Sequence, residues 1–221
     1  KKPLMIQEYF EGKEVKSLNI KEAKNFGIFL AQLHNSIKKL HKNQTHWKIG
    51  YQFRRKESSF NAPTIHLDHE FKLLHTALKE IKEEKLKRGI IHGDLSGSNI
   101  LRNSKGEVML CDWDDARIDY LVYDLAVFIG NMFIKPQKLY TQTIKSFLQG
   151  YQTITSLNEE EKKAMYYFIQ NSLLWGLEYG AKQKQIHTEK EKGITSWMVN
   201  HEKKYLRIKK IGIYNFLKCF K

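Results

Sequence analysis

The chain has 221 residues, of which 41% are hydrophobic and 12% are aromatic, so it is long enough for one domain with a sizeable core. It carries 38 Lys and Arg against 24 Asp and Glu, a formal net charge of +14. The lysines are scattered along the chain and form no single arm. This pattern favours a solvated basic surface that also attracts anionic nucleotides over a dedicated nucleic-acid or membrane surface.

Cysteine content and apolar runs argue against a secreted or membrane protein. Cys111 and Cys219 are too few for a disulfide framework and favour a reducing cytoplasm. The first apolar run, Leu4-Met5-Ile6, is too short for a signal peptide. The best candidate for a membrane span, 121–134, is short and contains Asp124. We therefore expect a cytoplasmic protein without a membrane partner.

The first predicted elements are a short strand and a long helix. Residues 4–6 predict the strand, and residues 7–12 follow it as a turn. Asn19 is a candidate helix N-cap, because Glu22 follows at the spacing of a capping box. Apolar residues then recur every three or four positions and predict an amphipathic helix. They are Ala23, Phe26, Leu30, Leu33, Ile37 and Leu40.

A second helix is predicted from Asp68 to about Lys87, after a polar connection at 43–66. Phe71, Leu74, Leu78 and Ile81 would form its buried face. Gly89 would end this helix, and the next residues would lead into a loop. The histidines before and within this helix show no spacing that is typical of a zinc site.

The most informative stretch is 91–101, together with 111–114. Asp94 and Asn99 lie five positions apart on a loop that leads into a strand, and Asp112 follows a second apolar strand. Residues 103–106 predict a hairpin turn, which would fold the chain so that Asp112 returns beside Asn99. Two carboxylates and an amide oxygen brought together are what a Mg²⁺–nucleotide site needs. The alternative for Asp94 and Asn99 is a turn with side-chain hydrogen bonds.

The remainder of the chain is predicted to be helical. Asp124 would open one helix, and 139–151 would form another. Asn158 and Glu161 have capping-box spacing and predict the start of a third helix. We expect a loop at 182–193 and a last helix from about Ser196.

Three motifs carry a resemblance to a known family: His92-Gly93-Asp94 with Asn99, Asp112-Trp113-Asp114, and Tyr123-Asp124-Leu125-Ala126. Together they resemble the superfamily of aminoglycoside phosphotransferases, choline kinases and type II homoserine kinases, which have a protein-kinase-like fold. Protein kinases usually carry Arg where Gly93 stands, and no Ala-Pro-Glu segment follows. The resemblance is specific over about 91–130.

The resemblance implies ATP and Mg²⁺ as cofactors and assigns roles to particular residues. Asp94 would be the catalytic base, and Asn99 and Asp112 would hold the metal. Supporting roles fall to His92, Asp114 and Asp124. The hinge that binds adenine would include Glu8, Tyr9 and Phe10. An acceptor pocket would include Trp175, Glu178 and Tyr179, for which the alternative is a core-facing aromatic stripe.

The resemblance also implies the fold class, α+β and predominantly α-helical. Residues 1–12 would be the last strand of the N-lobe and the hinge. Residues 13–221 would form the helical C-lobe, with the catalytic β-hairpin and the catalytic and metal loops at 91–115. The chain has no Gly-x-Gly-x-x-Gly motif and no good match for the N-lobe strand lysine. We therefore expect the N-lobe to be largely absent, as in a fragment of a longer protein or a truncated gene, or to be supplied by a partner chain.

The implied function is transfer of the ATP γ-phosphoryl group to a hydroxyl of a small polar metabolite or antibiotic. Residues 148–151 and 157–161 most resemble the homoserine kinase type II branch, and choline or an aminoglycoside stays open as acceptor. One alternative is a truncated, non-catalytic lobe that acts as a binding module. Another is a basic nucleic-acid-binding helical domain, which would not explain the spacing of Asp94, Asn99 and Asp112.

Overall fold

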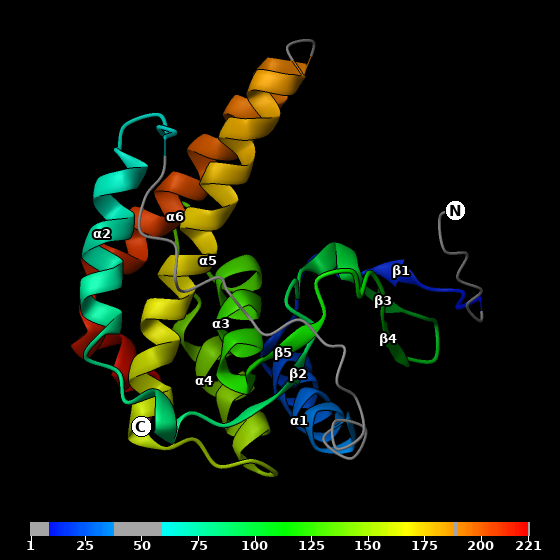
Figure 1. The fold of residues 1–221 in the computed structure, drawn as a ribbon. Helices are drawn as coiled ribbons and strands as arrows, with labels where there is room; N and C mark the ends of the chain where they lie inside the picture. Colours follow the sequence, from blue (N-terminus) through cyan, green and yellow to red (C-terminus); the bar gives the residue numbers. More distant parts are fainter. Residues whose placement is uncertain (1–8, 38–58, 188–189, 221) are drawn as a thin grey trace, which may run out of the picture.

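Figure 1 shows a helical body with a small three-stranded sheet at one edge and two long helices that project together from it. This computed structural model describes residues 9–37, 59–187 and 190–220. The predicted strand at 4–6, the continuation of the first helix to Leu40 and most of the connection at 43–66 lie outside the described residues. The predominantly helical α+β class predicted from the sequence is confirmed.

The first helix, α1, spans Ile20–Ile37 and begins as its sequence predicts. The Glu22 backbone N–H donates to Asn19 Oδ1 at 2.9 Å, and the Asn19 N–H donates to Glu22 Oε2 at 2.8 Å. This reciprocal pair satisfies two N–H groups that a helix start otherwise leaves without partners. The face that carries Phe26 and Leu30 is buried in the core.

The second helix, α2, is shorter than predicted. It spans Leu67–Leu78 and is followed by the 3₁₀ turn η3, Glu83–Lys85, and the strand β2, Arg88–Ile91. The prediction of helix to about Lys87 is therefore wrong, as is a helix end at Gly89. Hydrogen bonds from a distant helix explain the difference, since the Lys87 backbone N–H and Nζ both donate to the Glu161 carboxylate, at 3.2 and 2.8 Å.

Two small sheets flank the central loop. In the first, β1 (Lys13–Glu14), β3 (Ile100–Arg102) and β4 (Val108–Leu110) lie in the order β1-β3-β4, all antiparallel. The β3–β4 hairpin is the predicted one, with Ile100 opposite Leu110. In the second sheet, β2 pairs antiparallel with β5, Arg117–Tyr120, a strand that the sequence did not predict. The loop between β2 and β3 includes the 3₁₀ turn η4, Gly97–Asn99.

The core is centred on α3, Leu121–Met132, which is buried at eleven of its twelve positions. Around it pack α1, α4 (Thr141–Gln152) and α5 (Glu159–Ile186), and α6 (Glu191–Leu217) packs along α5 and is followed by η6, Lys218–Phe220. The capping box of Asn158 and Glu161 that starts α5 is confirmed. In the described residues, no helix is both long and apolar enough to cross a membrane.

The predicted loop at 182–193 is wrong. Helix α5 continues to Ile186 and α6 begins at Glu191, so only a short connection joins the two projecting helices in Figure 1. The segment is polar, but its charges pair between the helices, as Lys184 Nζ lies 3.0 Å from Glu191 Oε1. Packing between two long helices here outweighs local composition.

Candidate active site

Asp124, in the first turn of α3, holds the loop that follows β2. Its side chain is 0% exposed. The carboxylate accepts hydrogen bonds from the backbone N–H groups of His92 and Gly93, both at 2.8 Å. It also lies 3.1 Å from Nε2 of His34, whose Nδ1 lies 2.9 Å from the Tyr151 hydroxyl. One buried carboxylate therefore fixes the loop through charge-assisted hydrogen bonds and ties it to α1 and α4.

His92 joins the two loops of the site. Its Nδ1 accepts a hydrogen bond from the Asp94 backbone N–H at 3.4 Å, and its Nε2 donates to the Cys111 carbonyl at 3.0 Å. The ring is buried and packs against Trp113, with ring centroids 4.7 Å apart. With both nitrogens engaged, His92 braces the backbone of both loops.

Gly93 occupies a position that a side chain would not fit. Its φ of +87° lies in the left-handed region, where only glycine is unstrained. An added Cβ would lie 2.4 Å from Nη1 of Arg117 and 2.6 Å from the Asp115 carbonyl. The buried Arg117 side chain from β5 fills this space and pairs with Asp119, with Nε 3.0 Å from Oδ2. The Asp115 carbonyl accepts a hydrogen bond from Arg117 Nη1 at 3.0 Å.

Asp94 and Asn99 meet across the turn that separates them. Asn99 Nδ2 donates to Asp94 Oδ2 at 3.0 Å and to the Asp94 carbonyl at 2.9 Å. Because the amide nitrogen is used in this way, Asn99 Oδ1 points to the other side, where the Ser98 hydroxyl approaches only to 3.4 Å. Asp94 and Asn99 thus present one carboxylate and one amide oxygen on a turn that is held by hydrogen bonds.

The environment of Asp94 disfavours its ionised form. Burial raises the pKa of the Asp94 carboxyl above its usual range, and the negative charges of Asp115 and Asp112 raise it further. The hydrogen bond from Asn99 opposes this effect. A partly buried acid among other carboxylates is an arrangement found at many catalytic and metal sites.

Asp112 follows β4 in a strained conformation. Its φ is +62°, and among the described residues it is the only non-glycine with a positive φ. Strain of this kind at a non-glycine residue costs about 1–3 kcal/mol and clusters at functional sites. The backbone bond from Cys111 N–H to the Asn99 carbonyl, 3.0 Å long, holds the two loops side by side. The Asp112 side chain is exposed, as is that of Asp114.

The donor set fits a magnesium ion better than a zinc ion. Within the part of the chain that the structure describes, no three His, Cys, Asp or Glu side chains converge as a metal site. Asn99 and Asp112 instead supply one amide and one carboxylate oxygen. Magnesium is usually bound in this way, by one or two protein oxygens with substrate phosphates and water completing the shell.

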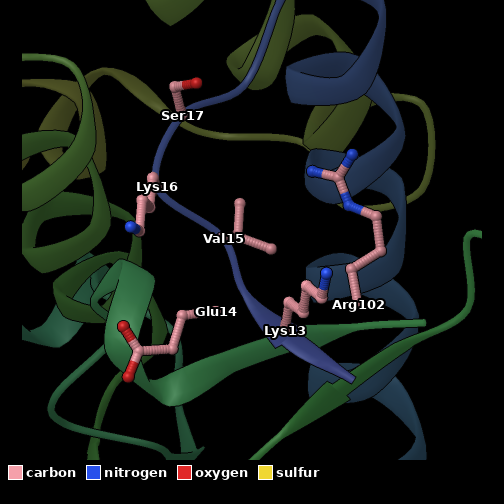
Figure 2. Close-up of a pocket in the computed structure, with 6 residues that line it drawn as sticks. All are labelled: Lys13, Glu14, Val15, Lys16, Ser17 and Arg102. Carbon is pink, nitrogen blue, oxygen red and sulfur yellow. The ribbon is translucent and has the colours of Figure 1, made fainter. Parts of the chain in front are cut away.

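Residues 13–17, called the linker below, border a pocket of about 670 Å³ beside the β3–β4 hairpin (Figure 2). The Val15 N–H donates to the carbonyls of Gly97 and Ile100, both at 3.0 Å, so the linker is bonded to the catalytic turn. Figure 2 shows Lys13 and Arg102 on one side of this linker and Glu14 on the other. No local signal in the sequence predicts this pocket, because Arg102 of β3 lies 85 or more residues along the chain from the other lining residues, 13–17.

The predicted hinge residues are only partly described. Glu8 lies outside the described residues. Tyr9 is 86% exposed, and Phe10 is half-buried. An added Cβ at Gly12 would lie 2.7 Å from the Phe10 ring and 3.1 Å from Cβ of Leu101. The segment after the hinge thus lies against β3 of the metal-loop hairpin.

The three predicted acceptor residues on α5 do not line one surface. Trp175 is half-buried and meets the Phe71 ring edge-on, with centroids 6.4 Å apart. Glu178 is fully buried, 3.3 Å from Lys182 Nζ, whereas Tyr179 is 61% exposed. The pocket in Figure 2 does not include these residues.

Comparison with known proteins assigns the chain to a family. The model of a family described as "Phosphotransferase enzyme family" matches residues 1–159. Homoserine kinase of Zymomonas mobilis is 22% identical over 185 residues, a match that covers 78% of this chain and 56% of that protein. The chain thus spans little more than half the length of this curated relative.

Solved structures share the fold at low identity. An amicoumacin kinase, solved in complex with AMP-PNP, Ca²⁺ and Ami, has a TM-score of 0.65 at 15% identity, covering 93% of this chain and 64% of that one. A microcompartment-associated aminopropanol kinase has a TM-score of 0.65 at 17% identity, covering 92% and 66%. The kinase-like fold and the superfamily predicted from the sequence are thereby confirmed.

Proposed function

The chain belongs to the phosphotransferase enzyme family, and we propose that it transfers the γ-phosphoryl group of ATP to a hydroxyl group of a small molecule. The observation that carries this proposal is the pairing of Asp94 with Asn99 at 3.0 Å, on a turn held beside the strained Asp112. The comparisons support a small-molecule kinase in general. The individual residue roles, ATP and Mg²⁺ belong to the proposal.

Asp94 is the proposed catalytic base. Its carboxylate orients the acceptor hydroxyl and accepts the hydroxyl proton late, because phosphoryl transfer through a loose transition state needs little activation of the nucleophile. The hydrogen bond from Asn99 sets the direction of the carboxylate. His92 and Asp124 act through the backbone, since their side chains accept hydrogen bonds from the N–H groups of residues 92–94, where the turn begins.

Asn99 and Asp112 are the proposed metal ligands. A bound Mg²⁺ would neutralise charge on the β- and γ-phosphate oxygens. The positive φ of Asp112 turns its carboxylate out of the β4 ladder, where the described residues supply it with no hydrogen-bond partner. Asp114, two residues on and exposed, is proposed to support the same site from outside.

The nucleotide is proposed to lie between the hinge segment and the β3–β4 hairpin. Residues 1–12 would provide the last N-lobe strand and the hinge, with Tyr9 and Phe10 at its end, and 13–221 would form the helical C-lobe. Lys13 and Lys16 add positive charge to the pocket in Figure 2, whose lining also includes Glu14 and Arg102, the latter paired with Glu22 of α1. The two lysines outnumber Glu14, which favours a polyphosphate. Both cysteines are free, which fits a reducing cytoplasm.

The test is ADP release with Mg²⁺-ATP and a panel of hydroxyl acceptors. Homoserine is tested first, because the curated relative is a homoserine kinase, followed by choline, ethanolamine, 1-amino-2-propanol and kanamycin. We expect one acceptor to stimulate ADP release. The Asp94→Asn variant should lose that stimulation by roughly 10²-fold or more, because general-base groups contribute about 10²–10⁴-fold.

A matched control is Asp68→Asn, which makes the same chemical change at a residue on α2 outside the site. This variant should keep the acceptor-dependent rate. An Asp94→Asn variant as fast as the unmodified protein would contradict the role of Asp94. No stimulation by any acceptor in the full panel, with ATP binding intact, would favour the alternative of a non-catalytic binding lobe.

A further inference from the structure

A basic hollow lies between the connection that follows α3 and the first half of α6. Its volume is about 600 Å³. Its walls carry Lys135 and Lys138 from the connection and Trp197, His201 and Lys204 from α6. Within the described part of the chain, the lining residues include no Asp and no Glu.

The positive charge in this hollow is not offset by nearby carboxylates. Among the described residues, Lys135, Lys138 and Lys204 form no ion pair. Lys135 Nζ reaches only the Asn131 carbonyl, at 3.5 Å, and Lys138 Nζ lies 4.7 Å from the Tyr140 ring centre. Burial and, to a lesser extent, the charge of Lys135 together lower the pKa of Lys204 to about 8. Partly buried cations that repel each other favour an anion between them.

The aromatic wall of the hollow is held in place by two glycines of α5. An added Cβ at Gly176 would lie 2.9 Å from the His201 ring, and one at Gly180 would lie 2.8 Å from the Trp197 ring. The glycines let α6 approach α5 closely at these two rings. Trp197 and His201 are four residues apart on α6, and their rings lie tilted by 32° with centroids 3.8 Å apart. Burial lowers the pKa of His201 to about 4, so the imidazole is neutral near pH 7 and serves as a hydrogen-bonding surface. The hollow is therefore shaped by helix packing and does not rest on loose surface lysines.

The hollow is connected to the candidate active site through α3. Asn131 Nδ2 donates to the carbonyl of Leu95, the residue after Asp94, at 3.0 Å. The carbonyl of the same Asn131 accepts from Lys135. One residue thus links the turn that carries the proposed base to the cationic wall.

We propose that this hollow binds an anionic group, a carboxylate or a phosphate, of the acceptor molecule. The proposal rests on the function proposed above and narrows its substrate class to hydroxyl compounds that carry a negative charge. A purely cationic acceptor such as choline would be repelled by Lys135 and Lys204 and would gain nothing from the hollow. Its lining also differs from the predicted acceptor pocket, since it includes none of Trp175, Glu178 and Tyr179.

The first test is binding without nucleotide, using two matched pairs of probes. L-homoserine is compared with its amide, and glycerol 3-phosphate with glycerol, so that each pair differs in one anionic group. Binding is followed by NMR through the indole N–H of Trp197, assigned with the Trp197→Phe variant. We expect saturable shifts with one or both probes that carry the anionic group and none with the partners that lack it. Which anion binds decides between carboxylate and phosphate.

The lysines are then replaced singly. Lys204→Gln and Lys135→Gln should each weaken binding of the anionic probe by roughly tenfold or more, because each removes a charge-assisted hydrogen bond. Lys203→Gln, an exposed neighbour on α6, removes the same charge outside the hollow and should leave binding unchanged. Thermal melting and circular dichroism of each variant show whether it is folded.

Turnover separates the failure of this inference from the failure of the proposed function. Anion binding that depends on Lys135 and Lys204, without any ADP release, supports the hollow as a binding site and overturns the proposed kinase function. ADP release with an anionic acceptor whose KM is unchanged in both lysine variants overturns the hollow and leaves the kinase standing. Absence of shifts with both anionic probes, or equal loss in Lys203→Gln, also overturns it.

Discussion

At the scale of single residues, the candidate site is built from side chains in unfavourable settings. Asp94 is partly buried near Asp112 and Asp115, and Asp112 adopts a positive φ. Each setting costs folding free energy, and neither is explained by packing. At side chains of this kind, a substitution that raises stability often lowers activity.

The Asp94→Asn variant should be more stable than the unmodified protein near pH 7. The unfolded carboxyl titrates near 3.8, and burial raises the pKa in the folded state. Between the unfolded and the folded pKa the folded state binds more protons, so stability falls as pH rises through this window and the cost is greater at pH 7 than at acid pH. Asn carries no charge and avoids this cost.

Urea unfolding at pH 7 and at pH 3.5 measures the effect. The gain from Asp94→Asn should be present at pH 7 and should shrink at pH 3.5, where the carboxyl is protonated in the folded state. The Asp68→Asn control on α2 loses an exposed ion pair with Lys72 and should change little. A variant that is destabilised at pH 7 would contradict the burial argument for Asp94.

At the scale of elements, the sequence predicts what depends on local signals. The starts of α1 and α5 and the β3–β4 turn were predicted, because capping boxes and a glycine turn act over a few residues. The end of α2, the strand β5 and the length of α5 were not. These depend on distant partners such as the Glu161 carboxylate, which holds Lys87 extended.

The same division applies to the candidate site. Spacing alone predicted that Asp112 returns beside Asn99, because the hairpin between them is short. The linker pocket at 13–17 and the basic hollow at Lys135 and Lys204 gave no pattern in the sequence, because their walls come from segments that meet only in the folded chain.

The contact between β5 and the catalytic loop can be tested with two glycines. Gly93 and Gly106 have nearly equal φ values, +87° and +83°, but an added Cβ meets Arg117 at Gly93 and nothing within 4 Å at Gly106. Gly106→Ala should cost about 1–2 kcal/mol from the left-handed backbone alone. Gly93→Ala should cost about 3 kcal/mol or more, since overpacking adds to that strain.

Free energies of unfolding from urea titration give both costs. The difference between the two variants measures the crowding at Gly93 by Arg117 and the Asp115 carbonyl, because the left-handed φ is shared. Equal costs would show that both groups move aside freely and that the loop does not depend on this close packing.

At the scale of the whole molecule, one hydrophobic core joins all the major helices. It extends from Val15 in the linker to Cys219 at the end of the chain and surrounds α3. The three-stranded sheet lies at the edge of the helical body, whereas β2 and β5 lie within it beside α3 and α1 (Figure 1). The candidate site thus has an exposed hairpin on one side and the helical body on the other, which would suit the proposed transfer between two substrates.

Hydrogen exchange should reveal this arrangement. The backbone amides of α3 should exchange most slowly, because eleven of its twelve residues are buried and its opening requires the core to open. The exposed tip of the β3–β4 hairpin, 104–107, should exchange fastest among the described parts of the site. Exchange in α3 as fast as in the hairpin would show that the core does not unfold as a unit.

The hydrogen-bonded chain from Tyr151 through His34 to Asp124 has a consequence for genetics. Because this chain ends on the backbone of His92 and Gly93, damage in α1 or α4 reaches the catalytic loop without touching a ligand. A selection for loss of activity would therefore recover alleles at Tyr151 and His34 beside those at Asp94. Such alleles would map to the centre of the helical body and be mistaken for simple folding mutants.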